Sequence, residues 1–375
     1  MAQSQPYSGI RILDFTHWCG SYAGRLFADL GAEVVRVEPP GGLPDRQRGG
    51  ANSAQFAFVN ATKKSVVLDA ETPQGRERLA GLLASSQIVL VERGGPLFDR
   101  VVELRRDYPS LVVTAISPFG LTGPVADAPA SDLVLQAAGG IAWMSGRISD
   151  APLRLPFDQA AMVGGIYAAT VTAIALFDAE ATGNGHLIDV SVQECIAHSL
   201  QNAIQVWDLE QRISIRGGVG TRDASEDIFP CKDGLVFLAS PLSLGGSWPA
   251  LVGWMNELGH SSGVALSKER WSSREWRLTA EARTAFREVF TAFTADRTKA
   301  ELTEAAIARR IVMGPVNRIG DLFTDEQLVH SGFFQTLSDG LTFPGAPYRL
   351  SSPVWEARPA PALGADDPLL SSAEF

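Results

Sequence analysis

Apolar and polar residues alternate along the first third of the chain in a pattern that predicts strands and helices in turn. Short, almost uninterrupted apolar runs predict buried strands at residues 10–15, 32–38, 65–70, 87–92 and 111–117. Between them, segments with helical spacing predict helices at 21–31, 72–86 and 97–109. This alternation indicates a parallel sheet with helices on both faces, in a Rossmann-like arrangement.

The pattern changes after about residue 200. Residues 217–227 (GGVGTRDASED) have loop composition, residues 228–240 (IFPCKDGLVFLAS) predict two short strands around a Lys-Asp-Gly turn, and helical, Trp-containing segments follow. Residues 356–370 are rich in Pro and Ala and predict a surface strap. We therefore expect a large α/β domain at 1–200 that is completed by 330–375, a small α+β domain at 222–320, and linkers at about 200–222 and 320–330.

Composition excludes several classes of protein. The 375 residues carry a formal net charge of -10, which disfavours nucleic acid as a partner. No run of eighteen uninterrupted apolar residues predicts a membrane span, and the first residues do not have the pattern of a signal peptide. The three cysteines show no CxxC spacing, so we expect no metal site, no disulfide framework and a cytoplasmic location.

The first turn between strand and helix, THWCGSYAG, lacks the GxGxxG pattern, so NAD is not expected as a cofactor. This turn carries His17, Trp18 and Cys19 at the sheet edge where α/β proteins bind ligands. A catalytic Cys/His couple would need a third, orienting group. We therefore expect His17 and Cys19 to line a pocket, with Trp18 beside them as a further pocket candidate.

Asp158 directly precedes a long run of small and apolar residues that predicts a helix from about Gln159 to Ala179. One interpretation is a helix N-cap, in which the side chain accepts backbone N–H bonds. The other is a covalent nucleophile, because the carboxylate is followed by Gly164-Gly165, which would let another backbone or a ligand approach closely. Local sequence leaves both open.

Asp132 has a similar setting, at the head of an apolar segment that ends in Gly139-Gly140, and capping is again the simpler interpretation. Cations at strand ends, namely Arg36, Lys63 and Lys64, could meet a polyphosphate; a solvated charge is the alternative.

Several segments, taken in order, resemble the class III CoA-transferase family (CaiB/BaiF type), which includes formyl-CoA transferase, carnitine CoA-transferase and α-methylacyl-CoA racemases. The likeness covers nearly the whole chain. It rests on these segments: GIRILDFTHWCGSYAGRLFADLGAEVVRVEPPGG, FVNATKKSVVLDAETPQGRERL, AISPFGLTGP, SDLVLQAAGG, PFDQAAMVGGIYAA, HLIDVSVQE, MGPVNRIGDLF and PALGADDPLL.

The resemblance implies an interlocked homodimer and a CoA-transferase that moves CoA from an acyl-CoA to a free carboxylic acid. Asp158 falls at the position of the family's acyl-accepting nucleophile, which forms a mixed anhydride and then an aspartyl-CoA thioester. Coenzyme A is then a substrate, and no permanently bound cofactor is expected. Trp18, Cys19, Ser131 and Asp132 are expected in the substrate pocket.

Two departures from the family qualify this expectation. Racemase members have His-Asp where this chain has Ser131-Asp132, and a serine cannot replace an imidazole base at neutral pH. The family's VENFRPG segment near adenosine reads VERGGPL, with Arg93 as an expected CoA contact, and formyl-CoA with oxalate is not the expected substrate pair. The alternatives to a transferase are a racemase or isomerase of CoA esters and a non-catalytic subunit of a heteromeric transferase. The acyl group stays open.

Overall fold

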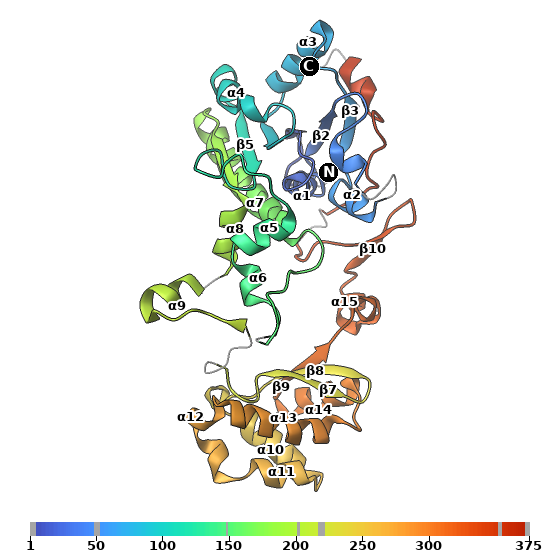
Figure 1. Cartoon of the computed structure of the whole chain (residues 1–375). Coiled ribbons are helices and arrows are strands. Elements are labelled where there is room, and N and C mark those ends of the chain that lie inside the picture. Colours follow the sequence, from blue (N-terminus) through green and yellow to red (C-terminus); the bar gives the residue numbers. More distant parts are fainter. Residues whose placement is uncertain are drawn as a thin grey trace. The chain divides into compact units, whose positions relative to one another are not determined.

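The computed structural model describes residues 5–48, 53–147, 149–200, 203–216, 222–351 and 355–371. Contacts divide the chain into two compact units, which are described separately (Figure 1). The first comprises Met1–Ser145, Ala151–Arg212 and His330–Phe375, and the second comprises Gly146–Asp150 and Ile213–Val329. The chain thus changes unit at 145–146, 150–151, 212–213 and 329–330, and the short excursion at 146–150 was not expected from the sequence.

The first unit is built on a six-stranded sheet with the order β3-β2-β1-β4-β5-β6, in which every neighbouring pair is parallel. This is the strand order of a doubly wound Rossmann-type sheet. The predicted α/β class and parallel sheet are therefore confirmed. The strands are β1 (Arg11–Asp14), β2 (Glu33–Glu38), β3 (Lys64–Val67), β4 (Ile88–Glu92), β5 (Val112–Ser117) and β6 (Leu187–Ser191).

Successive apolar residues of the central strands face two different cores, so these strands carry apolar side chains on both faces. In β4, Ile88 and Leu90 join the core formed with α1, α5, α7 and α8, whereas Val89 and Val91 join the core formed with α3 and α4. The helices of this unit are α1 (Ser21–Ala28), α2 (Ala54–Val59), α3 (Pro73–Ala84), α4 (Val101–Asp107), α5 (Asp132–Ala138), α6 (Ile141–Met144), α7 (Gln159–Thr182), α8 (Val192–Ser199) and α9 (Ala203–Glu210).

Helix α7 is the longest element in the described chain, and it is long and apolar enough to cross a membrane by length and composition alone. Its small residues pack against α1 and β5, and Gly164 and Gly165 are buried. A Cβ atom built on Gly165 would lie 3.2 Å from the backbone N of Ala23 in α1. The close backbone approach that the glycine pair predicted is therefore present.

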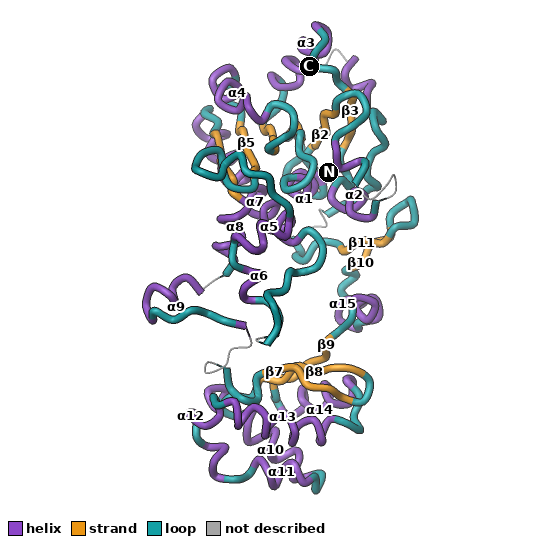
Figure 2. The backbone as a smooth tube through the Cα atoms, viewed as in Figure 1, coloured by secondary structure: helices purple, strands orange, loops and turns teal. Residues whose placement is uncertain are grey.

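The C-terminal part of the first unit covers the outer edge of the sheet. The strands β10 (Phe334–Thr336) and β11 (Thr342–Pro344) pair as an antiparallel hairpin (Figure 2). Further on, Asp366 accepts a hydrogen bond from the backbone N–H of Ser65, and Asp367 accepts one from Val67. Because β3 is an edge strand, these carboxylates occupy N–H groups that would otherwise face outward.

The second unit combines an antiparallel sheet with helices. Its sheet has the order β7-β8-β9, and β7 and β8 flank the predicted Lys-Asp-Gly turn. Buried aromatic residues of α10 and α13 form its core. Its elements are β7 (Asp227–Cys231), β8 (Gly234–Ala239), α10 (Ser247–Glu257), α11 (Ser261–Leu266), α12 (Arg274–Arg277), α13 (Ala280–Thr294), α14 (Lys299–Arg309) and β9 (Val312–Val316), followed by α15 (Glu326–His330) across the change of unit.

Candidate active site

Asp158 occupies the N-cap position of α7, but its side chain caps nothing. Its Oδ2 instead accepts a hydrogen bond of 2.5 Å from Nε2 of Gln55 in α2, and Nη1 of Arg48 lies 3.7 Å from the same oxygen. The side chain is 24% exposed. The N-cap interpretation of Asp158 is therefore wrong as far as the side chain is concerned, and the carboxylate points to partners outside its own helix.

Asp132 caps α7 in its place. Its Oδ1 accepts hydrogen bonds from the backbone N–H groups of Ala160 at 2.8 Å and Ala161 at 3.3 Å, and its Oδ2 accepts one from Nε2 of Gln136 at 2.5 Å. Burial raises the pKa of Asp132, and the hydrogen bonds from Gln136 and the two N–H groups offset this only in part. The predicted capping role is thus present, but on a helix that begins 27 residues further along the chain.

Ser131 caps the helix that Asp132 was expected to cap. Its hydroxyl accepts a hydrogen bond of 3.4 Å from the backbone N–H of Val134, at the start of α5. Ser131 and Asp132 also border the cavity that holds Asp158. The structure therefore brings these three predicted residues together.

The residue before Asp158 has an unusual backbone conformation. Phe157 has φ = 60°, in the left-handed region, and its side chain is 81% exposed. For a bulky residue without favourable packing this conformation costs on the order of 1 to 3 kcal/mol, and such strain is often found at functional sites.

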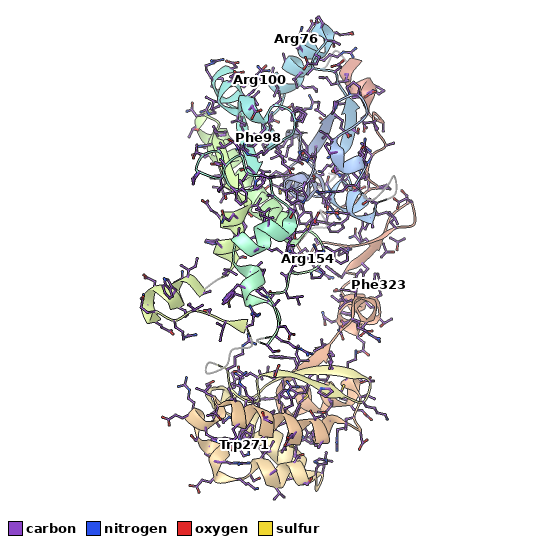
Figure 3. All side chains as sticks on the ribbon, viewed as in Figure 1. Arg76, Phe98, Arg100, Arg154, Trp271 and Phe323 are labelled. Atoms are coloured by element: carbon purple, nitrogen blue, oxygen red, sulfur yellow. The ribbon has the colours of Figure 1, made fainter. Side chains whose placement is uncertain are left out.

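A cavity of about 420 Å³ opens beside Asp158, within the usual size range of a small-molecule site. Two arginines border it: Arg48, whose guanidinium lies 5.4 Å from the ring of Trp18, and Arg154, on the loop between α6 and α7 (Figure 3). Its lining consists of Trp18, Arg48, Ser53, Gln55, Ser131, Asp132, Leu133, Arg154 and Asp158. Sequence reasoning missed Arg48, Gln55 and Arg154, because no local motif marks them and only the fold brings them to Asp158.

The first turn between strand and helix is organised by Glu92, at the end of β4. Four consecutive backbone N–H groups, those of residues 17–20, donate to its buried carboxylate at 2.8 to 3.2 Å. Such a nest of N–H groups can bind an anion, and here the protein supplies the anion itself. A turn that already binds a protein carboxylate agrees with the missing GxGxxG pattern. The hydrogen bond from the Trp18 N–H to Glu92 also holds Trp18 at the cavity. Sequence reasoning missed Glu92, although its place at the end of a central strand was a usable signal.

Cys19 belongs to this turn and its side chain is fully buried. The expectation that Cys19 lines the pocket is therefore wrong, because the thiol does not reach the cavity. Burial raises the pKa of Cys19 well above its ordinary value, and the charge of Glu92 adds to this. His17 Nδ1 lies 4.0 Å from Glu92 Oε1. A buried thiol with a raised pKa is a poor nucleophile, which disfavours a Cys/His mechanism.

Two of the cations expected at CoA phosphates are buried inside the first unit. Arg36 donates hydrogen bonds to Asp45 and to Oδ1 of Asn60, the latter at 3.0 Å. Lys63 donates to Oδ2 of Asp14 at 2.6 Å, and burial lowers the pKa of Lys63. Neither side chain reaches the surface, so a phosphate contact by either would require the surrounding loops to rearrange.

The other two expected cations are partly exposed. Lys64 pairs with Glu33 at 2.6 Å and its side chain is 38% exposed. The Arg93 side chain is 20% exposed and pairs at 2.6 Å with Asp127, whose side chain is 93% exposed. Exposed ion pairs of this kind contribute little to stability and can exchange partners with a ligand phosphate. In the part of the chain that the structure describes, no group of three His, Cys, Asp or Glu residues is arranged to hold a metal ion.

The model of CoA-transferase family III matches residues 7–367 of this sequence. The chain belongs to CoA-transferase family III. This family III CoA-transferase is similar to the succinyl-CoA:(R)-benzylsuccinate CoA-transferase subunit BbsE of Thauera aromatica, with 37% identity over 96% of this chain and 92% of the relative. It is also similar to the succinate–glutarate CoA-transferase of Agrobacterium fabrum, with 28% identity over 96% of this chain and 93% of the relative.

A solved structure supports the fold of the family III CoA-transferase. A CaiB/BaiF family protein from Brucella suis matches with a TM-score of 0.86 and 24% identity, over 98% of this chain and 99% of that chain. The recognition of the family from its eight ordered segments is therefore confirmed.

Proposed function

We propose that this enzyme moves CoA from an acyl-CoA thioester to a free carboxylic acid, with Asp158 as the covalent nucleophile. The observation that carries the proposal is the state of the Asp158 side chain. It borders a cavity at a helix start, yet Asp132 performs the capping, so the Asp158 carboxylate is left available for reaction.

The proposed reaction proceeds by two exchanges at the same carboxylate. An oxygen of Asp158 attacks the thioester carbonyl carbon, the C–S bond breaks, and CoA leaves as a thiolate. The thiolate then attacks the aspartyl carbonyl of this mixed anhydride, which releases the donor acid and forms an aspartyl-CoA thioester. An acceptor carboxylate reverses these steps: it attacks the aspartyl thioester, releases the thiolate, and is itself attacked by the thiolate to give the new acyl-CoA and free Asp158.

The contacts of Asp158 support this role. Gln55 donates a hydrogen bond to Oδ2, which orients the carboxylate, while Oδ1 accepts no hydrogen bond from the residues that the structure describes. Gln55 and Arg48 are also donors that can stabilise negative charge developing on a carbonyl oxygen of the intermediates.

The test is replacement of Asp158 by Asn, with Asp99→Asn, at an exposed residue that does not line the cavity, as the matched control. We expect Asp158→Asn to lose CoA transfer while the control retains it. Hydroxylamine added with acyl-CoA should convert the activated Asp158 of the native enzyme to a hydroxamate, detected as a peptide mass change. Near-full transfer by Asp158→Asn, with hydrolysis to Asp excluded by mass, would overturn the mechanism.

The racemase alternative receives no support at the Ser131 position, because that hydroxyl caps α5 and is not a base at neutral pH. The subunit alternative is separated by assay: a non-catalytic subunit would transfer no CoA alone and would need a second chain. One relative is itself named as a subunit, so the assay should be run on the purified chain first.

For the remaining contacts we propose that Lys64 and Arg93 meet CoA phosphates and that Arg36 and Lys63 support the fold from inside. We also propose a homodimer. Apolar side chains of α7 and α9 that are exposed in the single chain support it: Ile174, Phe177, Trp207 and Leu209. The three cysteines are unpaired, which agrees with the proposed cytoplasmic location.

A further inference from the structure

The cavity beside Asp158 is bordered by two arginines, and the carboxylates of the protein do not neutralise both of them. Asp132 is occupied by α7 and by Gln136, so Asp158 is the one carboxylate of the lining that faces the arginines. Arg48 lies near it, at 3.7 Å. Arg154 is exposed and makes no hydrogen bond or ion pair within the described residues.

A third donor is also unused. Nε1 of Trp18 is buried and has no hydrogen-bond partner among the residues that the structure describes. A buried N–H without a partner costs free energy, and a ligand oxygen would satisfy it. Trp18 borders the same cavity as the two arginines, so a small shift of its ring would bring this N–H to a ligand bound there.

The reaction changes the charge of this cavity, and this argument rests on the proposed function. When Asp158 carries an acyl group or CoA, its negative charge is gone, and Arg48 loses its counter-charge. Arg48 is then ready to hold the reacting carboxylate of the incoming acid. A monocarboxylic acid would satisfy Arg48 and would still leave Arg154 without an anion.

We infer that the acid substrate is a dicarboxylate, whose reacting carboxylate meets Arg48 and whose second carboxylate binds Arg154. The guanidinium of arginine is suited to this task because it binds a carboxylate through two parallel hydrogen bonds. Arg154 is thus the residue that selects a diacid over the monoacid with the same carbon chain.

The experiment compares pairs of acids that differ only in the second carboxylate, such as glutarate with valerate and succinate with butyrate, together with branched and aryl-substituted pairs. Product acyl-CoA is measured for the full-length native enzyme and for Arg154→Met, Arg154→Lys and Arg78→Met. Arg78 is an exposed arginine on α3, outside the cavity, and serves as the matched control.

For the native enzyme we expect kcat/KM to favour the best diacid by at least about tenfold over its matched monoacid, the effect of one charge-assisted hydrogen bond. Arg154→Met should lose this preference and keep its rate with monoacids, Arg154→Lys should retain part of it, and Arg78→Met should behave as the native enzyme. An equal loss for both members of each pair, a rise in KM for the acyl-CoA alone, or no preference in the native enzyme would overturn the inference. A rise in KM for acyl-CoA would identify Arg154 as a CoA-phosphate contact.

A binding measurement separates this inference from the proposed function. Millimolar glutarate should raise the thermal midpoint of the native protein, valerate should not, and Arg154→Met should abolish the glutarate effect. If glutarate binds through Arg154 but no acid ever receives CoA, the proposed function fails and the site stands. If CoA transfer occurs but glutarate and valerate act alike on both proteins, the site fails and the proposed function stands.

Discussion

Asp132 and Asp158 have nearly the same sequence setting, yet they have different roles in the structure. Each precedes an apolar helix, and a pair of glycines follows each of them. Asp132 is 5% exposed and accepts hydrogen bonds from the first N–H groups of α7, whereas Asp158 lies at the cavity and accepts one from Gln55. Because Asp132 caps the helix, the Asp158 carboxylate stays available for the proposed covalent chemistry.

This division predicts that two alanine substitutions will differ in their effect on the free energy of unfolding. Asp132→Ala should lower the free energy of unfolding by about 1 to 2 kcal/mol, because α7 loses its cap. Asp158→Ala should change it by no more than about 0.5 kcal/mol, since that side chain caps nothing. Urea unfolding of both variants measures the difference. Equal destabilisation by the two substitutions would show that Asp158 also supports the helix.

At the residue scale, sequence identified Asp158, the proposed nucleophile, but only part of its surroundings. The family pattern marks Asp158 because the motif is contiguous, whereas Gln55 lies 103 positions away and reaches it only through the fold. Arg36 and Lys63 were expected at the surface, since cations usually are. Their buried acidic partners, Asp45 and Asp14, come from other segments, and no local pattern announces such pairing.

Among the elements, α1 and α7 depend on a contact that leaves no room for a side chain. A Cβ atom on Gly165 would lie 2.9 Å from Cβ of Tyr22 and 3.2 Å from the backbone N of Ala23. The backbone atom cannot move without moving α1. Since α1 follows the turn that carries Trp18, this packing also helps to position the cavity.

Gly165→Ala should therefore destabilise the protein, by about 1 to 3 kcal/mol from overpacking, although alanine favours a helix. Gly81→Ala is the matched control, because Gly81 lies in α3 with nothing within 4 Å of its built Cβ. The control should stabilise by up to about 1 kcal/mol. Thermal or urea unfolding measures the change in the free energy of unfolding for each substitution. Stabilisation by both substitutions would contradict the close packing.

At the end of β2, Glu38 connects the sheet to the loop that follows. Its carboxylate accepts hydrogen bonds from Arg46 at 2.6 and 2.7 Å and from Ser65 at 2.7 Å. Burial alone would raise the pKa of Glu38, but the hydrogen bonds from Arg46 and Ser65 and the charge of Arg36 outweigh it and lower the pKa from its ordinary value of 4.5. The folded protein thus favours the ionised form.

This pKa predicts acid sensitivity at Glu38. The unfolded chain takes up a proton on this carboxyl near pH 4.5, and the folded protein does so only at lower pH, so the stabilisation is complete above about pH 4.5 and is lost as the pH falls through the folded value. Glu38→Gln should cost about 1 to 3 kcal/mol near pH 7 and progressively less in acid. Urea unfolding over this pH range, with exposed Glu77→Gln as control, measures it; a constant difference would contradict the lowered pKa.

At the element scale, the sequence was most informative where burial is two-sided. The strands β1, β2, β4 and β5 were predictable because both faces of the parallel sheet are covered, which requires continuous apolar runs. The hairpin β10–β11 and helix α2 were not, since each is short and packs through only a few residues. Phe58 and Phe343 meet there in an edge-on contact between segments far apart in the sequence.

For the whole molecule, exposed apolar side chains on α7 predict that two copies of the chain associate. Ile174 is 65% and Phe177 is 77% exposed in the single chain, an unusual amount of apolar surface for one helix. Phe177→Glu should shift the proposed dimer toward monomer, because burial of the new charge is costly. Val102→Glu, on α4, is the control with a similarly exposed apolar residue. Sedimentation velocity measures the mass; a monomeric native protein, or a dimer in every variant, would contradict the prediction.

The pairing of β3 with the last residues has a consequence for producing the protein. The carboxylates of Asp366 and Asp367 hold the outward N–H groups of Ser65 and Val67, as a neighbouring strand would. A chain shortened before residue 366 would expose this edge of the sheet, and open edges recruit strands from other molecules. Such a chain should accumulate as insoluble aggregate in the expressing cell, even though every residue at the cavity is still present.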